Sequence, residues 1–266
     1  MELVEEALSK AIDIAVEKTL EGAAHLGHSL VGKLRRARGQ VLKGYAVRLA
    51  AKHSKAKTFL VRQPTYLYDF YLPSSITYAG DNRLERVGVQ GLAGLGGRVV
   101  IAGTGGSGKT MLMRHLLLDA FQAGSIPIFV ELRNLNGRSE ADLLGFLSES
   151  LEINGIDLPT ADLRELILSG AFLLLLDGLD EVEFSRRSEL MRQIEALVGQ
   201  SRSQTIITSR LDSSLDGWSD FMPVRMANLS IEEACELVER VGFEHEISAK
   251  FVERLRGGLY EEHRYF

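Results

Sequence analysis

The feature that most constrains the fold is the eight-residue segment GTGGSGKT at residues 103–110, which fits the pattern G-x-x-x-x-G-K-[ST]. The apolar run Arg98–Ala102 before it predicts a buried strand, and residues 108–121 predict a helix. A strand, a glycine-rich loop and a helix N-terminus direct backbone N–H groups and a partial positive charge at one concave space. Such a nest suits a polyphosphate, and glycine permits both the close approach and positive φ.

We therefore predict that the loop residues bind phosphate groups, that Lys109 reaches the terminal phosphates, and that the Thr110 hydroxyl binds Mg²⁺. The predicted loop consists of Gly103, Thr104, Gly105, Gly106, Ser107 and Gly108.

A second motif, FLLLLDGLDEV at residues 172–182, is an apolar strand that ends in an acid. An aspartate at the tip of a buried parallel strand would face the phosphate loop, so we expect Asp177 to hold the Mg²⁺, directly or through water. Asp180 and Glu181 follow on the next turn, where one of them could orient or deprotonate a water molecule. The alternative is that these two residues form an exposed acidic turn.

A third motif, TIITSR at residues 205–210, puts Arg210 at the tip of another strand. The guanidinium could sense or neutralise a γ-phosphate, or it could be a solvated arginine at a strand end. One further strand, at 127–132, separates the loop strand from the Asp177 strand in sequence. We therefore predict an α/β P-loop NTPase sandwich of three layers, with a parallel five-stranded sheet in the order 5-1-4-3-2 counted from Arg98.

The alternation of apolar and helical patterns divides the chain into four regions. Residues 1–56 predict two helices with a turn near 27–29, and residues 57–97, which contain Pro64 and Pro73, predict a connector. Residues 98–230 predict the nucleotide-binding domain, with strands at 204–209 and Met222–Met226 and helices near 140–152, 161–169 and 185–199. Residues 231–266 predict the start of a helical domain that is incomplete.

The net charge of −5 is unevenly distributed, because residues 22–68 hold ten basic residues and no acidic residue. The basic part at 33–62 could bind nucleic acid or anionic lipid. It could equally form the solvated face of a helix or dock on the acidic remainder of the chain. The single cysteine, Cys235, allows no internal disulfide, and no apolar run approaches the roughly 20 residues of a membrane span, so we expect a cytoplasmic protein.

Together these segments resemble the NACHT family of signal-transduction ATPases, within the STAND class of the AAA+ group. The resemblance is carried by GTGGSGKT, IFVELRNL, LLLLDGLDEV and TIITSR, in that order, and by the small Gly178 that follows Asp177. The stretch DFYLP at 69–73 is similar to the lead-in of bacterial members. Lys109 and Thr110 correspond to the family's Walker A positions, Asp177 to its Walker B position and Arg210 to its sensor arginine.

The resemblance implies a switch that binds ATP or ADP with Mg²⁺. Family members are closed at rest, sense a trigger through a C-terminal domain, self-associate and activate an N-terminal effector, and many bacterial members act against phage. The family continues beyond the point where this chain ends, so we expect a fragment or a truncated gene product.

Three alternatives stay open from the sequence. The chain could be a turnover ATPase, such as an AAA+ motor or loader, or a nucleic-acid-binding N-terminal module with a regulatory ATPase. A GTPase is disfavoured because the base-reading N-K-x-D motif is absent from the sequence.

Overall fold

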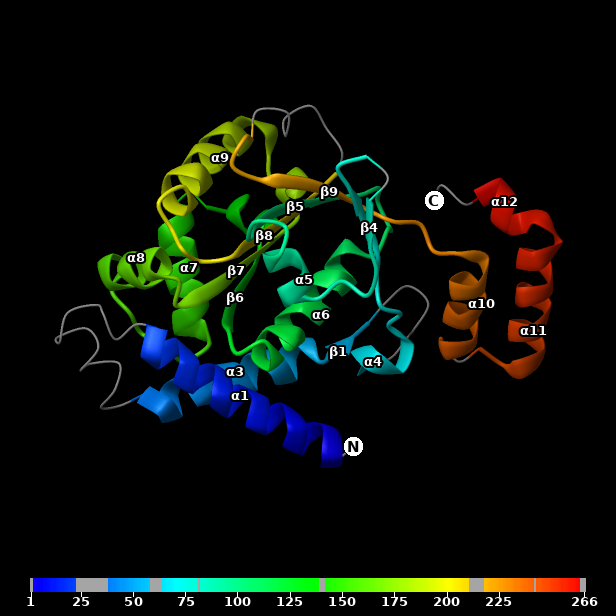
Figure 1. Ribbon diagram of the computed structural model, residues 1–266, viewed down its shortest axis with the longest axis horizontal. Helices are drawn as coiled ribbons and strands as arrows, with labels where there is room; N and C mark the ends of the chain where they lie inside the picture. Colours follow the sequence, from blue (N-terminus) through cyan, green and yellow to red (C-terminus); the bar gives the residue numbers. More distant parts are fainter. Residues whose placement is uncertain are drawn as a thin grey trace.

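A seven-stranded sheet forms the centre of the protein (Figure 1). The computed structural model describes residues 2–22, 38–57, 64–80, 82–138, 142–210, 218–241 and 243–263. The strand order is β4-β3-β9-β5-β8-β7-β6. The strands are β3 (Ile76–Tyr78), β4 (Asn82–Leu84), β5 (Arg98–Ala102), β6 (Ile126–Glu131), β7 (Phe172–Asp177), β8 (Thr205–Ser209) and β9 (Met222–Met226).

The five strands β5 to β9 are paired in parallel, in the spatial order β9-β5-β8-β7-β6. This order is the predicted 5-1-4-3-2. The predicted total of five strands is wrong, because β3 pairs antiparallel with β9 and β4 pairs antiparallel with β3. These two strands cover the edge of β9 that the five-stranded sheet would have left unpaired.

The segment predicted as a connector thus contributes to the sheet and forms further short elements. Residues on either side of the undescribed stretch 58–63 form a two-stranded ribbon of β1 (Lys55–Ala56) and β2 (Thr65–Tyr66). Two short helices, α4 (Leu67–Phe70) and α5 (Val89–Ala93), follow, and α5 packs against α6 and β5.

The central strands are apolar, and the crossover helices cover the faces of the sheet. All six residues of β7 are buried, as expected for a central strand of a covered parallel sheet. The helix α6 (Lys109–Gln122) connects β5 to β6, while α7 (Leu143–Ile153), α8 (Thr160–Ser169) and α9 (Phe184–Val198) lie on the return connections. Right-handed crossovers put α6 on one face and the return helices on the other.

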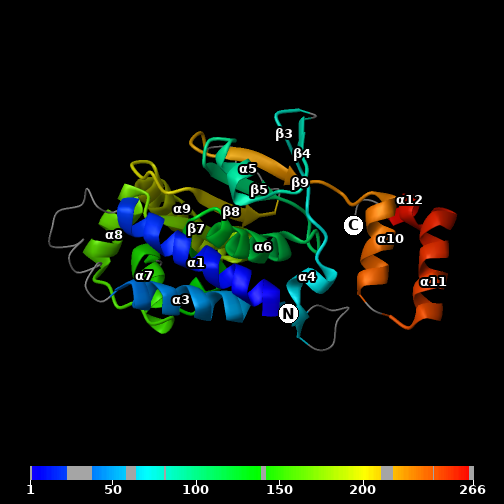
Figure 2. The same cartoon turned by 60° about the horizontal axis from the view of Figure 1, so that its bottom comes forward.

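The two N-terminal helices, α1 (Glu2–Gly22) and α3 (Arg38–His53), pack on α6 on the same side of the sheet (Figure 2). Ile12 of α1 and Tyr45 of α3 belong to the same buried cluster as the sheet strands. The Tyr45 hydroxyl donates a hydrogen bond of 2.8 Å to the carbonyl of Pro127 in β6. The N-terminal region therefore shares one hydrophobic core with the sheet.

Two basic residues of the segment 33–62 also contribute to the packing of the N-terminal helices. Lys43 of α3 pairs with Asp13 of α1 at 2.7 Å, and Arg48 donates to the Asn154 carbonyl at the end of α7. The predicted turn at 27–29, and the basic residues at 33–37 and 58–62, lie outside the described residues.

The C-terminal helices α10 (Ile231–Arg240), α11 (His245–Arg254) and α12 (Tyr260–His263) lie to one side of the sheet (Figure 1). Ser230 begins α10 with a capping box, in which Glu233 completes the reciprocal hydrogen bonds. Arg240 donates to the Tyr71 carbonyl at 3.0 Å and so joins α10 to the lead-in segment. Among the described residues, no helix combines the length and apolar character that crossing a membrane would require.

Candidate functional site

The loop at residues 103–108 connects β5 to α6 and has the backbone that its glycines permit. Gly106 and Gly108 have φ of +81° and +88°, in the left-handed region that favours glycine. A Cβ on Gly103 would lie 2.5 Å from the Ser107 hydroxyl and 3.0 Å from Cγ of Met226, so any other residue there would require these side chains to move. The Ser107 hydroxyl is buried and has no hydrogen-bond partner within the described part of the chain, so it is free to bind a polar ligand at the loop.

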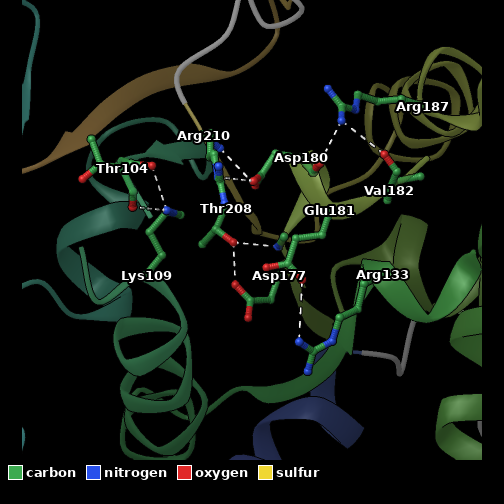
Figure 3. Close-up of polar contacts among 12 residues, drawn as sticks. Thr104, Lys109, Arg133, Asp177, Asp180, Glu181, Val182, Arg187, Thr208 and Arg210 are labelled. Carbon is green, nitrogen blue, oxygen red and sulfur yellow. Dashed lines mark hydrogen bonds and ion pairs between the residues drawn. The ribbon is translucent and has the colours of Figure 1, made fainter. Parts of the chain in front are cut away.

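Lys109 begins α6, and its side chain curls back over the loop (Figure 3). Its ammonium donates to the carbonyls of Gly103 and Thr104 at 2.7 and 2.8 Å. Partial burial lowers the pKa of Lys109, and the negative charge of Asp180 opposes this effect. A cation held at the mouth of a glycine-rich loop is suited to binding a phosphate.

Asp177 ends β7 and is only 6% exposed. Its Oδ2 accepts a hydrogen bond of 2.9 Å from the Thr110 hydroxyl, and its Oδ1 accepts one of 2.5 Å from the Thr208 hydroxyl. Burial raises the pKa of Asp177, while these two hydrogen bonds act in the opposite direction. The Thr110 hydroxyl and the Asp177 carboxylate are adjacent hard oxygen donors of the kind that Mg²⁺ prefers, so they fit this ion.

The turn after Asp177 carries both predicted acids. Gly178 has φ of +79°, and its N–H donates to the Thr208 hydroxyl at 2.8 Å. The Asp180 side chain is 11% exposed and pairs with Nε of Arg210 at 3.0 Å. Glu181 is half-exposed, with its Oε2 3.7 Å from Nη1 of Arg133. The two acids therefore differ in burial and partners, although they are adjacent in sequence.

Arg210 lies between this turn and the loop (Figure 3). Its backbone N–H and its guanidinium both bind the Asp180 carboxylate. Its Nη2 lies 3.7 Å from the position of a Cβ on Gly105, so it also approaches the loop. The sequence left two roles open for Arg210, contact with a γ-phosphate or a solvated position at a strand end. In the structure its side chain is largely exposed and pairs with Asp180.

All the residues predicted from the motifs lie at the carboxyl edge of the parallel strands. The structure brings together three groups of residues: Lys109 and Thr110 at the start of α6, Asp177, Asp180 and Glu181 at the end of β7 and in the turn after it, and Arg210 directly after β8.

Sequence reasoning did not single out four polar residues that support these groups. Arg133 approaches Glu181, and Asn136 donates to the Glu181 carbonyl at 2.9 Å. Arg187 donates to the Asp180 carbonyl at 2.8 Å, and Thr208 holds Asp177. Three of the four lie inside or directly beside the quoted motifs IFVELRNL and TIITSR, so attention to every polar position of those motifs would have found them.

A cavity of about 280 Å³ opens beside the loop. One wall comes from Phe70, Tyr71 and Leu72 in the segment before the sheet. Another comes from Leu237 of α10 and from Val241, the residue that follows α10. The floor includes Met111 and Met226 together with loop residues. Apolar walls beside a phosphate-binding loop are the surroundings that a nucleoside needs.

The family model of the NACHT domain matches residues 97–246, which is more than half of the chain. No curated protein matches the chain. The matched region contains the loop, the Asp177 turn, Arg210 and α10, and NACHT domains are P-loop NTPases that generally bind a nucleotide and Mg²⁺. The gathering of these motifs at one edge of a parallel sheet agrees with that match, and the chain belongs to the NACHT family of nucleotide-binding NTPase signalling modules.

Proposed function

We propose that the protein is an ATP/ADP switch that binds Mg–ATP at the loop and hydrolyses it slowly. One observation carries this proposal. The glycine-rich loop, the Thr110–Asp177 pair and the cavity lie next to one another, and the cavity is lined by two segments that are far apart in sequence. A nucleotide at the loop would contact both the lead-in and α10, so its phosphate state could alter how these two segments meet. The contact of Arg240 with the Tyr71 carbonyl supports this coupling.

Each residue has a distinct proposed role. Lys109 neutralises phosphate charge, and Thr110 with Asp177 holds the Mg²⁺, which supplies Lewis-acid stabilisation of the phosphate oxygens. Glu181 is the better candidate for orienting the attacking water, because it is half-exposed and its ion-pair distance is 3.7 Å. The Asp180 carboxylate already accepts a hydrogen bond from the Arg210 N–H and pairs with its guanidinium. We therefore assign Asp180 to holding Arg210 until a γ-phosphate competes for the guanidinium.

We further propose that the ATP state self-associates and activates the N-terminal region, as the family resemblance implies, in bacterial defence against phage in the cytoplasm. The helix α6 supports the mechanical part of this proposal, because it begins at Lys109 and packs against both α1 and α3. A shift of α6 on nucleotide exchange would therefore reach the N-terminal helices directly.

Lys109→Ala tests the site. Loss of the charge-assisted contacts should weaken ATP and ADP binding by at least about tenfold in calorimetric titrations. Lys250→Ala is a matched control, because Lys250 is an exposed lysine whose partner is Glu246 on α11. Unchanged affinity in Lys109→Ala would rule out the proposed nucleotide site.

A turnover ATPase is the alternative to a switch, and steady-state hydrolysis separates the two. A switch should turn over far more slowly than the median enzyme rate of about 10 s⁻¹. Self-association in Mg–ATP but not in ADP, followed by light scattering, tests the proposed output.

A further inference from the structure

Thr208 is a buried polar residue that contacts Asp177 and to which the proposed function assigns no role. It lies in β8 and is fully buried. Its hydroxyl donates to Oδ1 of Asp177 at 2.5 Å and accepts from the Gly178 N–H at 2.8 Å. A hydroxyl has one donor hydrogen, so its only hydrogen is directed at the Asp177 carboxylate.

The strand order explains why this side chain can reach Asp177. Strand β8 lies between β5, which leads into the loop, and β7, which ends at Asp177. Ile101 of β5 is paired with Thr208, and Leu176 of β7 is paired with Ile207. Thr208 therefore lies one residue beyond the Leu176 pair, at the level of Asp177.

The two oxygens of the Asp177 carboxylate are divided between two hydroxyl groups. Thr110 binds Oδ2 and Thr208 binds Oδ1, so the plane of the carboxylate is restrained from both sides. The hydrogen bond from Gly178 to Thr208 also restrains the first residue of the turn that carries Asp180 and Glu181. One hydroxyl thus orients the carboxylate and the start of the acidic turn together (Figure 3).

We propose that Thr208 is a positioning residue for the Mg²⁺–nucleotide site, acting through Asp177 rather than by touching the nucleotide. This inference rests on the proposed function, because it assumes that Asp177 and Thr110 hold Mg²⁺. Groups that orient metal ligands commonly change metal affinity by about 10- to 100-fold when they are removed.

Thr205 provides a matched control on the same strand. It is also fully buried, but its hydroxyl lies 3.5 Å from the Ser203 carbonyl, at the opposite end of β8 from the site. Thr205→Val and Thr208→Val make the same chemical change in the same strand. Thr208→Ser retains the hydroxyl, and Thr208→Ala removes it without adding a methyl group.

The experiment is a calorimetric titration of ADP into the full chain at a series of MgCl₂ concentrations and in EDTA, with thermal unfolding of each variant as a check on folding. We expect Thr208→Val and Thr208→Ala to raise the Mg²⁺ concentration for half-maximal enhancement of ADP affinity by about tenfold or more. Affinity in EDTA should stay at the wild-type value, and Thr208→Ser and Thr205→Val should behave as wild type.

Three results would overturn the inference, and only the third also overturns the proposed function. If the wild type shows Mg²⁺-dependent ADP binding and both hydroxyl-free variants match it, Thr208 has no positioning role and the site assignment stands. If ADP affinity falls equally in EDTA and in Mg²⁺, the hydroxyl supports the fold of the loop and not the metal site. A wild type that binds no ADP would overturn the proposed function together with this inference.

Discussion

Tyr45→Phe removes a single hydroxyl from the contact that holds α3 on the sheet. Tyr45 is fully buried, and burial raises the pKa of its hydroxyl well above the usual value, so it stays a donor at all ordinary pH values. The acceptor is the carbonyl of Pro127 in β6, at the edge of the sheet. Proline lacks an N–H and is tolerated on edge strands, where its carbonyl needs a partner from outside the sheet.

The expected loss of stability follows from the acceptor left behind. Removing one partner of a buried hydrogen bond costs about 1–3 kcal/mol, because the other partner stays desolvated and unpaired. We therefore expect the free energy of unfolding of Tyr45→Phe, from urea denaturation followed by circular dichroism, to fall by that amount.

Tyr68→Phe is the control for the same chemical change at a surface. Tyr68 is 47% exposed and its hydroxyl contacts His115 at 3.1 Å, so water can replace the lost bond. Its effect should stay within about 0.5 kcal/mol. Equal effects of the two substitutions would refute the reasoning that Tyr45 ties the N-terminal helices into the common core.

The remaining predictions concern the acidic turn and a buried histidine. Glu181→Gln should retain ATP binding and slow hydrolysis at least about tenfold, because a carboxamide is a poor base; unchanged turnover would shift the role to Asp180. Gly178→Ala should cost about 1–2 kcal/mol in urea unfolding, because its φ is +79° and a Cβ would lie 3.3 Å from Cδ of Glu181; full stability would contradict the backbone geometry. Burial, with the charges of Arg114 and Lys52, lowers the pKa of His53 to about 4, so the unfolded chain binds the proton more readily. Stability should therefore fall by up to about 3 kcal/mol between about pH 6.5 and pH 4, and His53→Gln should remove this component; the same pH profile in both proteins would contradict it.

The sequence predicted the parallel core well because each motif combines chemistry with a position in the fold. An apolar strand that ends in Asp177 and a strand followed by a glycine-rich loop belong to one parallel sheet. Asp177 and the loop must therefore lie at the same edge of that sheet. The predicted order of five strands then follows from right-handed crossovers and one inserted strand.

The strands β3 and β4 could not be predicted in the same way. Each has only three residues, and β4 is largely exposed, so neither shows the alternation that identifies a strand from sequence. They form because β9 offers an edge, which is a tertiary property. The cavity wall at Phe70–Leu72 was missed for the same reason, since its partner α10 lies far away in sequence.

The partners of individual side chains also could not be predicted from the sequence. Arg210 could be placed at the tip of a strand, but its pairing with Asp180 depends on the left-handed turn at Gly178. Docking on the acidic remainder of the chain is one of the alternatives for the basic segment, and it agrees with the ion pair of Lys43 with Asp13 in α1. Arg48 donates to a backbone carbonyl, that of Asn154. The other basic residues with described side chains, such as Lys52 and Lys57, stay exposed, so the prediction of nucleic-acid binding is still to be tested.

The most direct test of the account is the nucleotide that co-purifies with the protein, released by denaturation and identified by chromatography, with the steady-state hydrolysis rate measured on the same sample. The account predicts close to one retained ADP or ATP per chain and very slow turnover. An empty site with rapid ATP turnover would contradict the switch, and retained GDP would contradict the assignment of an adenine nucleotide.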